Sequence, residues 1–291
     1  MSSSTSQPQH QQDWATRIRA LDRAARIERL RVLAWQISLL LLLLLGVWEF
    51  GTRVPWLAKN INVFDPFFVS RPSRVLVQLV EWTCGAKAGH FWPHLFSTLS
   101  STLVGLTIAV ASGFSVGMLF SQRRRLAQVL SPFVVALNSL PRIAFVPLIT
   151  MVFGLGMASK VVTAWFIVFF MVFFNTFKGA CSIERELLEF CRTLGASERQ
   201  ITWTVRVPKA LSWTFAALPN AVSFSLIGVV LSEFVGSTTG MGYLIIVALS
   251  TLNSAEMFAA LTVLSVVGVT LVMLLRMVER RLLRWLPELR E

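Results

Sequence analysis

The stretch EFCRTLGASERQITWTVRVP, Glu189 to Pro208, places charged and turn-forming residues inside a largely apolar half of the chain. Glu189 and Arg192 are three positions apart, so their side chains fall on one face of a short helix. A carboxylate and a guanidinium there can form charge-assisted hydrogen bonds with another molecule or with neighbouring backbone. The chemistry predicted for this stretch is therefore recognition, by a short helix laid into a groove of a separate protein.

The same stretch holds residues that end one helix and begin the next. Gly195, followed by Ala196, tolerates the left-handed conformation that often ends a helix. Ser197 stands three residues before Gln200, which is the spacing of a capping box. Pro208 suits the first turn of a further helix. The sequence predicts helix, sharp turn and helix, although an ordinary solvated loop is also compatible with these residues.

Motifs for enzymatic chemistry are missing from the sequence. It contains no GxxxxGK[ST], GxSxG or HExxH stretch and no paired cysteine–histidine arrangement. The three histidines, His10, His90 and His94, are expected to be surface residues. The three cysteines are odd in number and lack CxxC spacing, which predicts neither a disulfide framework nor a metal site. We expect no catalytic residue, metal or cofactor in this chain.

The composition predicts a membrane protein. Hydrophobic residues make up 55% of the 291 residues and charged residues 14%, against about 25% charged residues in soluble domains. The net charge is +12, but the basic residues lie at the edges of apolar runs, as membrane topology would place them. Nucleic-acid binding would need them clustered on one exposed face. The fold class expected is an all-α, polytopic protein of the lipid bilayer, with no nucleic-acid partner.

Apolar runs predict about six transmembrane helices. We expect a basic cytoplasmic tail at 1–31, a first span at 32–50, a periplasmic loop with a short helix at 51–93, a membrane core at 94–280 that includes a cytoplasmic loop at 178–209, and a cytoplasmic tail at 281–291. Segment 14–31 has six basic residues and loop 178–209 has six, whereas the two later outer loops have one and none. By the positive-inside rule, both termini are expected in the cytoplasm.

Polar and helix-breaking residues within the apolar runs mark candidate positions along a translocation pathway. Asn138, Pro141 and Arg142 lie in the third run, where a broken helix and a simple proline kink are equally compatible. Arg142 either lines a cavity or extends to the inner surface. Glu233 is either a gate or tether near the outer mouth or a boundary residue that reaches water.

The stretch around Glu189 resembles the EAA loop of inner-membrane permease subunits of ATP-binding-cassette (ABC) importers. That loop reads E-A-A, three residues, G, nine residues and I-x-L-P. In this sequence the same frame holds Glu189, Phe190, Cys191, then Gly195, then Val205, Arg206, Val207 and Pro208. Phe190 and Cys191 replace the two alanines, which is a departure from the pattern.

Two further stretches extend the resemblance to residues 70–280. LPRIAFVPLITMVFGLG is similar to the P-x-x-A-x-x-P-L-x-x-x-x-F-G-x-G stretch of the nitrate, sulfonate and taurine branch of these permeases. SEFVGSTTGMGYLI is similar to that branch's segment before the last helix, whose glutamate matches Glu233. The resemblance implies the ABC type I importer permease fold in the bacterial inner (plasma) membrane.

The resemblance also implies partners. Two permease copies, expected as a homodimer, dock on two cytosolic ABC ATPase subunits, which bind ATP and Mg. A periplasmic solute-binding protein delivers a small solute, such as a sulfonate, nitrate or bicarbonate anion, although some members of the branch carry heterocycles. The coupling helix of the EAA loop lies in a groove of each ATPase, which implies coupling roles for Glu189, Arg192, Gly195, Ala196, Ser197 and Pro208.

Two other classes of protein compete with this interpretation. A secondary transporter driven by an ion gradient typically has inverted repeats and charged residues near the midplane of its helices. The sequence has no convincing repeat between its halves and few central charges. A membrane scaffold that transports nothing gives no reason for a loop with this spacing.

Overall fold

The structure is a computed structural model, and it describes residues 28, 31–33, 35–60, 64–122, 129, 132–133, 136 and 140–282. Every regular element within these residues is helical, as the fold class predicted. The chain divides into two compact units, Met1–Arg74 and Val75–Glu291, which are described separately.

The first unit contains a long apolar helix, Arg31–Arg53, where the sequence predicted the first span. The short helices α2 (Pro55–Asn60) and α3 (Pro66–Val69) follow it. The Glu49 carboxylate near the end of the long helix accepts a hydrogen bond from the Ser73 backbone N–H at 3.1 Å. This bond ties the end of the span to the segment that follows α3.

The second unit contains the remaining helices. In chain order they are α5 (Ala88–Ser121), a 3₁₀ turn (Arg142–Phe145), α7 (Val146–Phe153), α8 (Met157–Cys181), α9 (Arg185–Thr193), α10 (Glu198–Ile201), α11 (Val207–Val235), α12 (Met241–Ser250) and α13 (Ser254–Leu282). Helix α4 (Pro72–Thr83) is the short helix predicted within the first loop, and its first three residues belong to the first unit. Helix α5 begins at Ala88, within the segment that the sequence assigned to that loop.

Five helices in the described residues are long and apolar enough to cross a membrane. They are Arg31–Arg53, Ala88–Ser121, Met157–Cys181, Glu198–Val235 and Ser254–Arg281. Much of the first half of the third predicted span, 126–153, lies outside the described residues. Its last part is a 3₁₀ turn followed by the eight-residue helix α7, so this part is interrupted, as its prolines predicted.

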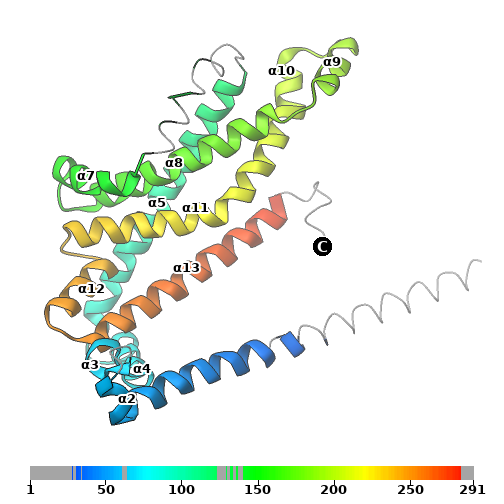
Figure 1. Ribbon diagram of the computed structural model, residues 1–291. Coiled ribbons are helices and arrows are strands. Elements are labelled where there is room, and N and C mark those ends of the chain that lie inside the picture. Colours follow the sequence, from blue (N-terminus) through cyan, green and yellow to red (C-terminus); the bar gives the residue numbers. More distant parts are fainter. Residues whose placement is uncertain are drawn as a thin grey trace, which may run out of the picture. The chain divides into compact units, whose positions relative to one another are not determined.

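Helices α5, α8 and α11 pack together through small residues (Figure 1). A Cβ atom at Gly113 of α5 would lie 3.0 Å from both the Phe169 carbonyl oxygen and the Val172 Cβ of α8. The two helices therefore touch backbone to backbone, which small residues permit within a membrane. The buried apolar residues between the three helices are Ala109, Val168, Val172, Leu218 and Ala221.

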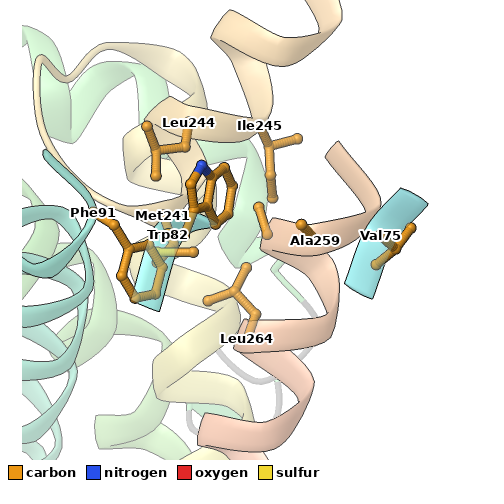
Figure 2. Packing of buried hydrophobic residues seen from close by; sticks show 9 residues of the cluster. Val75, Trp82, Phe91, Met241, Leu244, Ile245, Ala259 and Leu264 are labelled. Carbon is orange, nitrogen blue, oxygen red and sulfur yellow. The ribbon is translucent and has the colours of Figure 1, made fainter. Parts of the chain in front are cut away.

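A second apolar cluster joins α4, α5, α12 and α13 (Figure 2). The rings of Trp82 and Phe91 stack with their centroids 5.3 Å apart. Figure 2 shows them beside Met241 and Leu244 of α12 and Leu264 of α13. The sequence predicted only a glycine-rich outer segment before the last span, but residues from Met241 onwards form a helix because their apolar side chains have this core to pack against.

Helix α11 connects the two regions where functional residues gather. Figure 1 shows α9 and α10 beside its first residues and α12 beside its last. A movement at either end can therefore be carried along one continuous helix.

Candidate functional site

The polar hairpin, defined as Arg185–Arg206, is α9, a turn, α10 and a π-helical turn (Thr202–Arg206). Gly195 has a φ of +83°, the left-handed conformation that its position predicted. Its N–H donates to the Arg192 carbonyl at 2.9 Å, and the Ala196 N–H donates to the Cys191 carbonyl at 3.0 Å. This bond pair is a Schellman motif, which satisfies the last carbonyls of α9.

The second half of the polar hairpin begins with the predicted capping box. The Gln200 N–H donates to the Ser197 hydroxyl at 3.3 Å, and the Ser197 N–H donates to the Gln200 side-chain oxygen at 2.8 Å. Ile201, the last residue of α10, is buried. Pro208 lies in the first turn of α11, as predicted.

Five charged side chains of the polar hairpin pair with one another. Arg185 and Glu189 form an ion pair of 2.7 Å on α9. Glu198 joins the two arms, at 2.7 Å from Arg192 and 3.5 Å from Arg206. Arg192 was expected to bond with another molecule or with neighbouring backbone, and in this chain it bonds with the Glu198 side chain of the hairpin. Exposed ion pairs contribute only about 0–1 kcal/mol, so these groups can exchange one partner for another at little cost.

Helix α9 presents an apolar face that nothing in the described chain covers. Leu187, Phe190 and Leu194 are 45%, 62% and 71% exposed. Their spacing of three and four residues aligns them along one side of the helix. Such a row of anchors is how an amphipathic helix binds a groove. Sequence reasoning treated Phe190 only as a departure from alanine, although this apolar spacing could have identified it.

A buried ion pair lies at the other end of α11. The Lys160 ammonium of α8 is 3.1 Å from the Glu233 carboxylate of α11, and both side chains are almost completely enclosed. Lys160 also donates to the Thr239 carbonyl at 2.6 Å and to the Ser97 hydroxyl at 3.0 Å. Each proton of the ammonium therefore has an acceptor.

The Glu233 carboxylate is equally well bonded. It accepts hydrogen bonds from the Thr98 hydroxyl of α5 at 2.8 Å and from the Gly242 N–H of α12 at 2.8 Å. A Cβ atom at Gly240 would overlap this carboxylate, so a glycine is required there. The pair thus holds α5, α8, α11 and the start of α12 together.

The structure favours the interpretation of Glu233 as a tether between helices. A boundary residue that reaches water would be exposed, whereas Glu233 is enclosed and tethers four segments. Lys160 was not singled out in the sequence, because its position between two apolar runs suggested an outer loop. It lies instead in the first turn of α8.

The expectation for the histidines was wrong for His94. His94 is buried, and its Nδ1 accepts a hydrogen bond from the Gly240 N–H at 2.9 Å. Its ring stacks on Tyr243 of α12, with centroids 5.6 Å apart. Nearby, the Lys87 ammonium is 2.8 Å from the Glu256 carboxylate, and this hydrogen bond raises the pKa of Lys87 above its usual value.

The structure describes two of the three pathway candidates of the third span. Asn138 lies outside the described residues. Pro141 precedes the 3₁₀ turn that Arg142 begins. The Arg142 guanidinium donates to the Ile167 carbonyl at 3.0 Å and lies 5.2 Å from the centre of the Phe170 ring. These contacts pack Arg142 against α8 rather than extending it to a surface.

The family of the chain follows from its sequence match. Residues 101–284 match the model of the binding-protein-dependent transport system inner membrane component. The chain belongs to this family. It is therefore a permease subunit of an ABC importer and a multi-pass protein of the inner membrane, and the competing ion-gradient transporter is set aside.

Known relatives cover nearly the whole chain. The riboflavin transport system permease protein of Chloroflexus aurantiacus is 32% identical over 92% of this chain and 96% of its own length. The formylaminopyrimidine transport permease protein of Halalkalibacterium halodurans is 27% identical over 87% of this chain and 96% of its own length. The taurine transport system permease protein of Escherichia coli is 26% identical over 86% of this chain and 92% of its own length.

A solved structure supports the fold. A chain of the inward-facing MetNI methionine ABC transporter superposes with a TM-score of 0.55 and 22% identity, over 67% of this chain and 97% of that one. This likeness shows that the helices have the arrangement of an ABC importer permease.

Proposed function

We propose that the polar hairpin is the coupling element by which this permease binds a cytosolic ABC ATPase. The exposed apolar face of α9, formed by Leu187, Phe190 and Leu194, carries this proposal. These side chains would fill a groove of the ATPase, and Glu189 and Arg192 would exchange their internal partners for groups at its rim. Gly195 and Ala196 fix the turn between the arms, and Ser197 and Pro208 fix the starts of the helices that follow.

The assembly that we propose has two copies of this permease, two ATPase subunits and a periplasmic binding protein. Closure of the ATPases around ATP and Mg would move both hairpins. Because each hairpin continues through a π-helical turn into α11, its movement would reach the buried ion pair at the far end of that helix. The hairpin and both termini would lie in the cytoplasm.

The solute is proposed to be a small organic or inorganic anion, as expected from the resemblance to the sulfonate and taurine branch. The taurine permease relative supports this class. A heterocycle is the second candidate, because the riboflavin permease relative is 32% identical over 92% of the chain.

The test is co-purification with the ABC ATPase that a neighbouring gene encodes. Burying a Phe side chain contributes about 1.5–3 kcal/mol, so Phe190→Asp is expected to weaken binding by about 10- to 150-fold. Arg185→Gln, on the opposite face of α9, is the matched control and should bind as the unaltered chain does, because its ion pair with Glu189 is exposed.

ATPase activity in reconstituted vesicles provides the second measurement. Loaded binding protein should stimulate hydrolysis with the unaltered permease and not with Phe190→Asp. Equal binding and stimulation for Phe190→Asp and Arg185→Gln would refute the coupling role of α9. Solute uptake by the permease without any ATPase would refute the proposed function as a whole.

A further inference from the structure

Asn220 is a polar residue at the centre of a membrane-spanning helix. At 1.5 Å per residue it lies about 20 Å from either end of α11. The hydrocarbon core of a bilayer is about 30 Å thick, so this position is near its midplane. The Asn220 side chain is exposed on the surface of the chain rather than enclosed by other helices.

The Asn220 amide has no hydrogen-bond partner among the described residues. Asn175 of α8 provides a contrast, because its amide donates to the Met171 carbonyl of its own helix at 2.8 Å. An amide without a partner in hydrocarbon costs about 2–7 kcal/mol. Asn220 must therefore meet water, a solute or another copy of the chain in the assembled transporter.

Pro219 adds a second polar group at the same level. Proline has no N–H, so the Phe215 carbonyl one turn earlier loses the donor that a regular helix would supply. The Ser223 hydroxyl donates to the Pro219 carbonyl at 3.3 Å, so it does not bond the Asn220 amide. Freed backbone groups at membrane depth occur where protein or a water-filled cavity satisfies them.

A stripe of residues continues this surface along α11, and we call it the α11 stripe. Its members recur at alternating spacings of three and four, so they share one side of the helix. They are Trp213, Ala216, Asn220, Ser223 and Ile227. Trp213, at the start of the stripe, packs on Gly179 of α8, and beyond this contact the stripe presents the exposed amide of Asn220.

We propose that the α11 stripe lines the translocation pathway and that Asn220 is a hydrogen-bonding contact for the passing solute. The inference rests on the proposed function, because a pathway requires a transporter. The Asn220 amide offers a donor and an acceptor side by side and carries no charge. It suits a neutral group of the solute that both donates and accepts, such as an amide or a hydroxyl.

The charges of the spans agree with this chemistry. In α5, α8, α11 and α13 the described Asp, Glu, Lys and Arg residues lie toward the helix ends. Lys160 and Glu233 neutralise each other in a closed site. The midplane contact on α11 is therefore an uncharged one, and it selects by hydrogen bonding.

Cysteine accessibility tests the pathway. Cys84, Cys181 and Cys191 are replaced by serine, and Asn220→Cys is introduced into the full chain, which is reconstituted with its ATPase. A charged methanethiosulfonate reagent is supplied on both sides of the membrane. The reactive thiolate forms in water and not in hydrocarbon, so Asn220→Cys should react at least about tenfold faster than the controls. Val222→Cys is the buried control on α11, and Val266→Cys is the exposed apolar control on α13.

The solute contact is tested by ATPase stimulation with the neighbouring gene's binding protein, purified with its own solute. Asn220→Leu should lose this stimulation and Asn220→Gln should retain most of it, because only the amide can form the hydrogen bonds. Equal stimulation by both variants would overturn the contact.

Two outcomes would overturn the pathway. If Asn220→Cys reacts as slowly as Val266→Cys, the stripe faces lipid. If it forms a disulfide between two copies and does not react with the reagent, the stripe is a contact between copies. In both cases co-purification of the cysteine-free parent with the ATPase would leave the proposed function intact, whereas loss of that co-purification would count against the function itself.

Discussion

Removal of the Lys160 charge should destabilise the protein strongly. Lys160→Met keeps a similar length but leaves the Glu233 carboxylate enclosed without its cation. At the 3.1 Å separation, the Coulomb attraction is about 5 kcal/mol for an effective dielectric constant of about 20. Measured losses for breaking a buried pair are about 3–5 kcal/mol, in the same range.

A second substitution separates the lost charge from the lost packing. Glu233→Gln in the Lys160→Met background removes the unpaired charge and retains an oxygen for the Thr98 hydroxyl or the Gly242 N–H. The double variant should therefore be more stable than Lys160→Met alone, with a coupling of about 0.5–3 kcal/mol. Lys178→Met, an exposed lysine at the other end of α8, is the matched control.

Thermal unfolding of the purified permease in detergent measures these effects. One kcal/mol corresponds to about 2–4 °C for chains of 150–250 residues, so Lys160→Met should lower the midpoint by at least about 6 °C. The control should change it by less than about 2 °C. A midpoint for Lys160→Met equal to that of Lys178→Met, or a double variant less stable than the single one, would refute the role of the buried pair.

Three further substitutions test the backbone. Gly195→Ala should lower the free energy of unfolding by about 1–2 kcal/mol, because a Cβ strains the left-handed φ, and this loss should lower the thermal midpoint. Gly195→Asn should lose less stability, and equal losses for the two variants would contradict this reason. Gly105→Leu should lower stability by about 1–3 kcal/mol, since a Cβ there would lie 2.6 Å from the Ala164 Cβ, and Gly89→Leu, with nothing within 4 Å, is the control in the same assay. Ser197→Ala should lower the free energy of unfolding by about 1 kcal/mol and speed hydrogen exchange in α10, while Ser197→Asp should preserve the protection from exchange. Unchanged exchange in both variants would show that the Ser197 cap does not stabilise α10.

The sequence by itself determined the elements that depend on near neighbours. The turn at Gly195, the capping box of Ser197 with Gln200 and the position of Pro208 involve groups within a few residues of one another. The long apolar runs determined the five spans of the described residues in the same way, because length and hydropathy are properties of a single segment.

Only the tertiary structure decided which distant residues meet. Lys160 and Glu233 lie on different helices, and His94 meets Gly240 from a third. A sequence shows that a lysine or a histidine is present, but not whether another element brings a carboxylate or an N–H to it. The exposure of Asn220 was decided in the same way, because the helices that pack on α11 cover its other sides and leave this position open. Burial is a property of the whole packed arrangement, and for these residues it determines the chemistry.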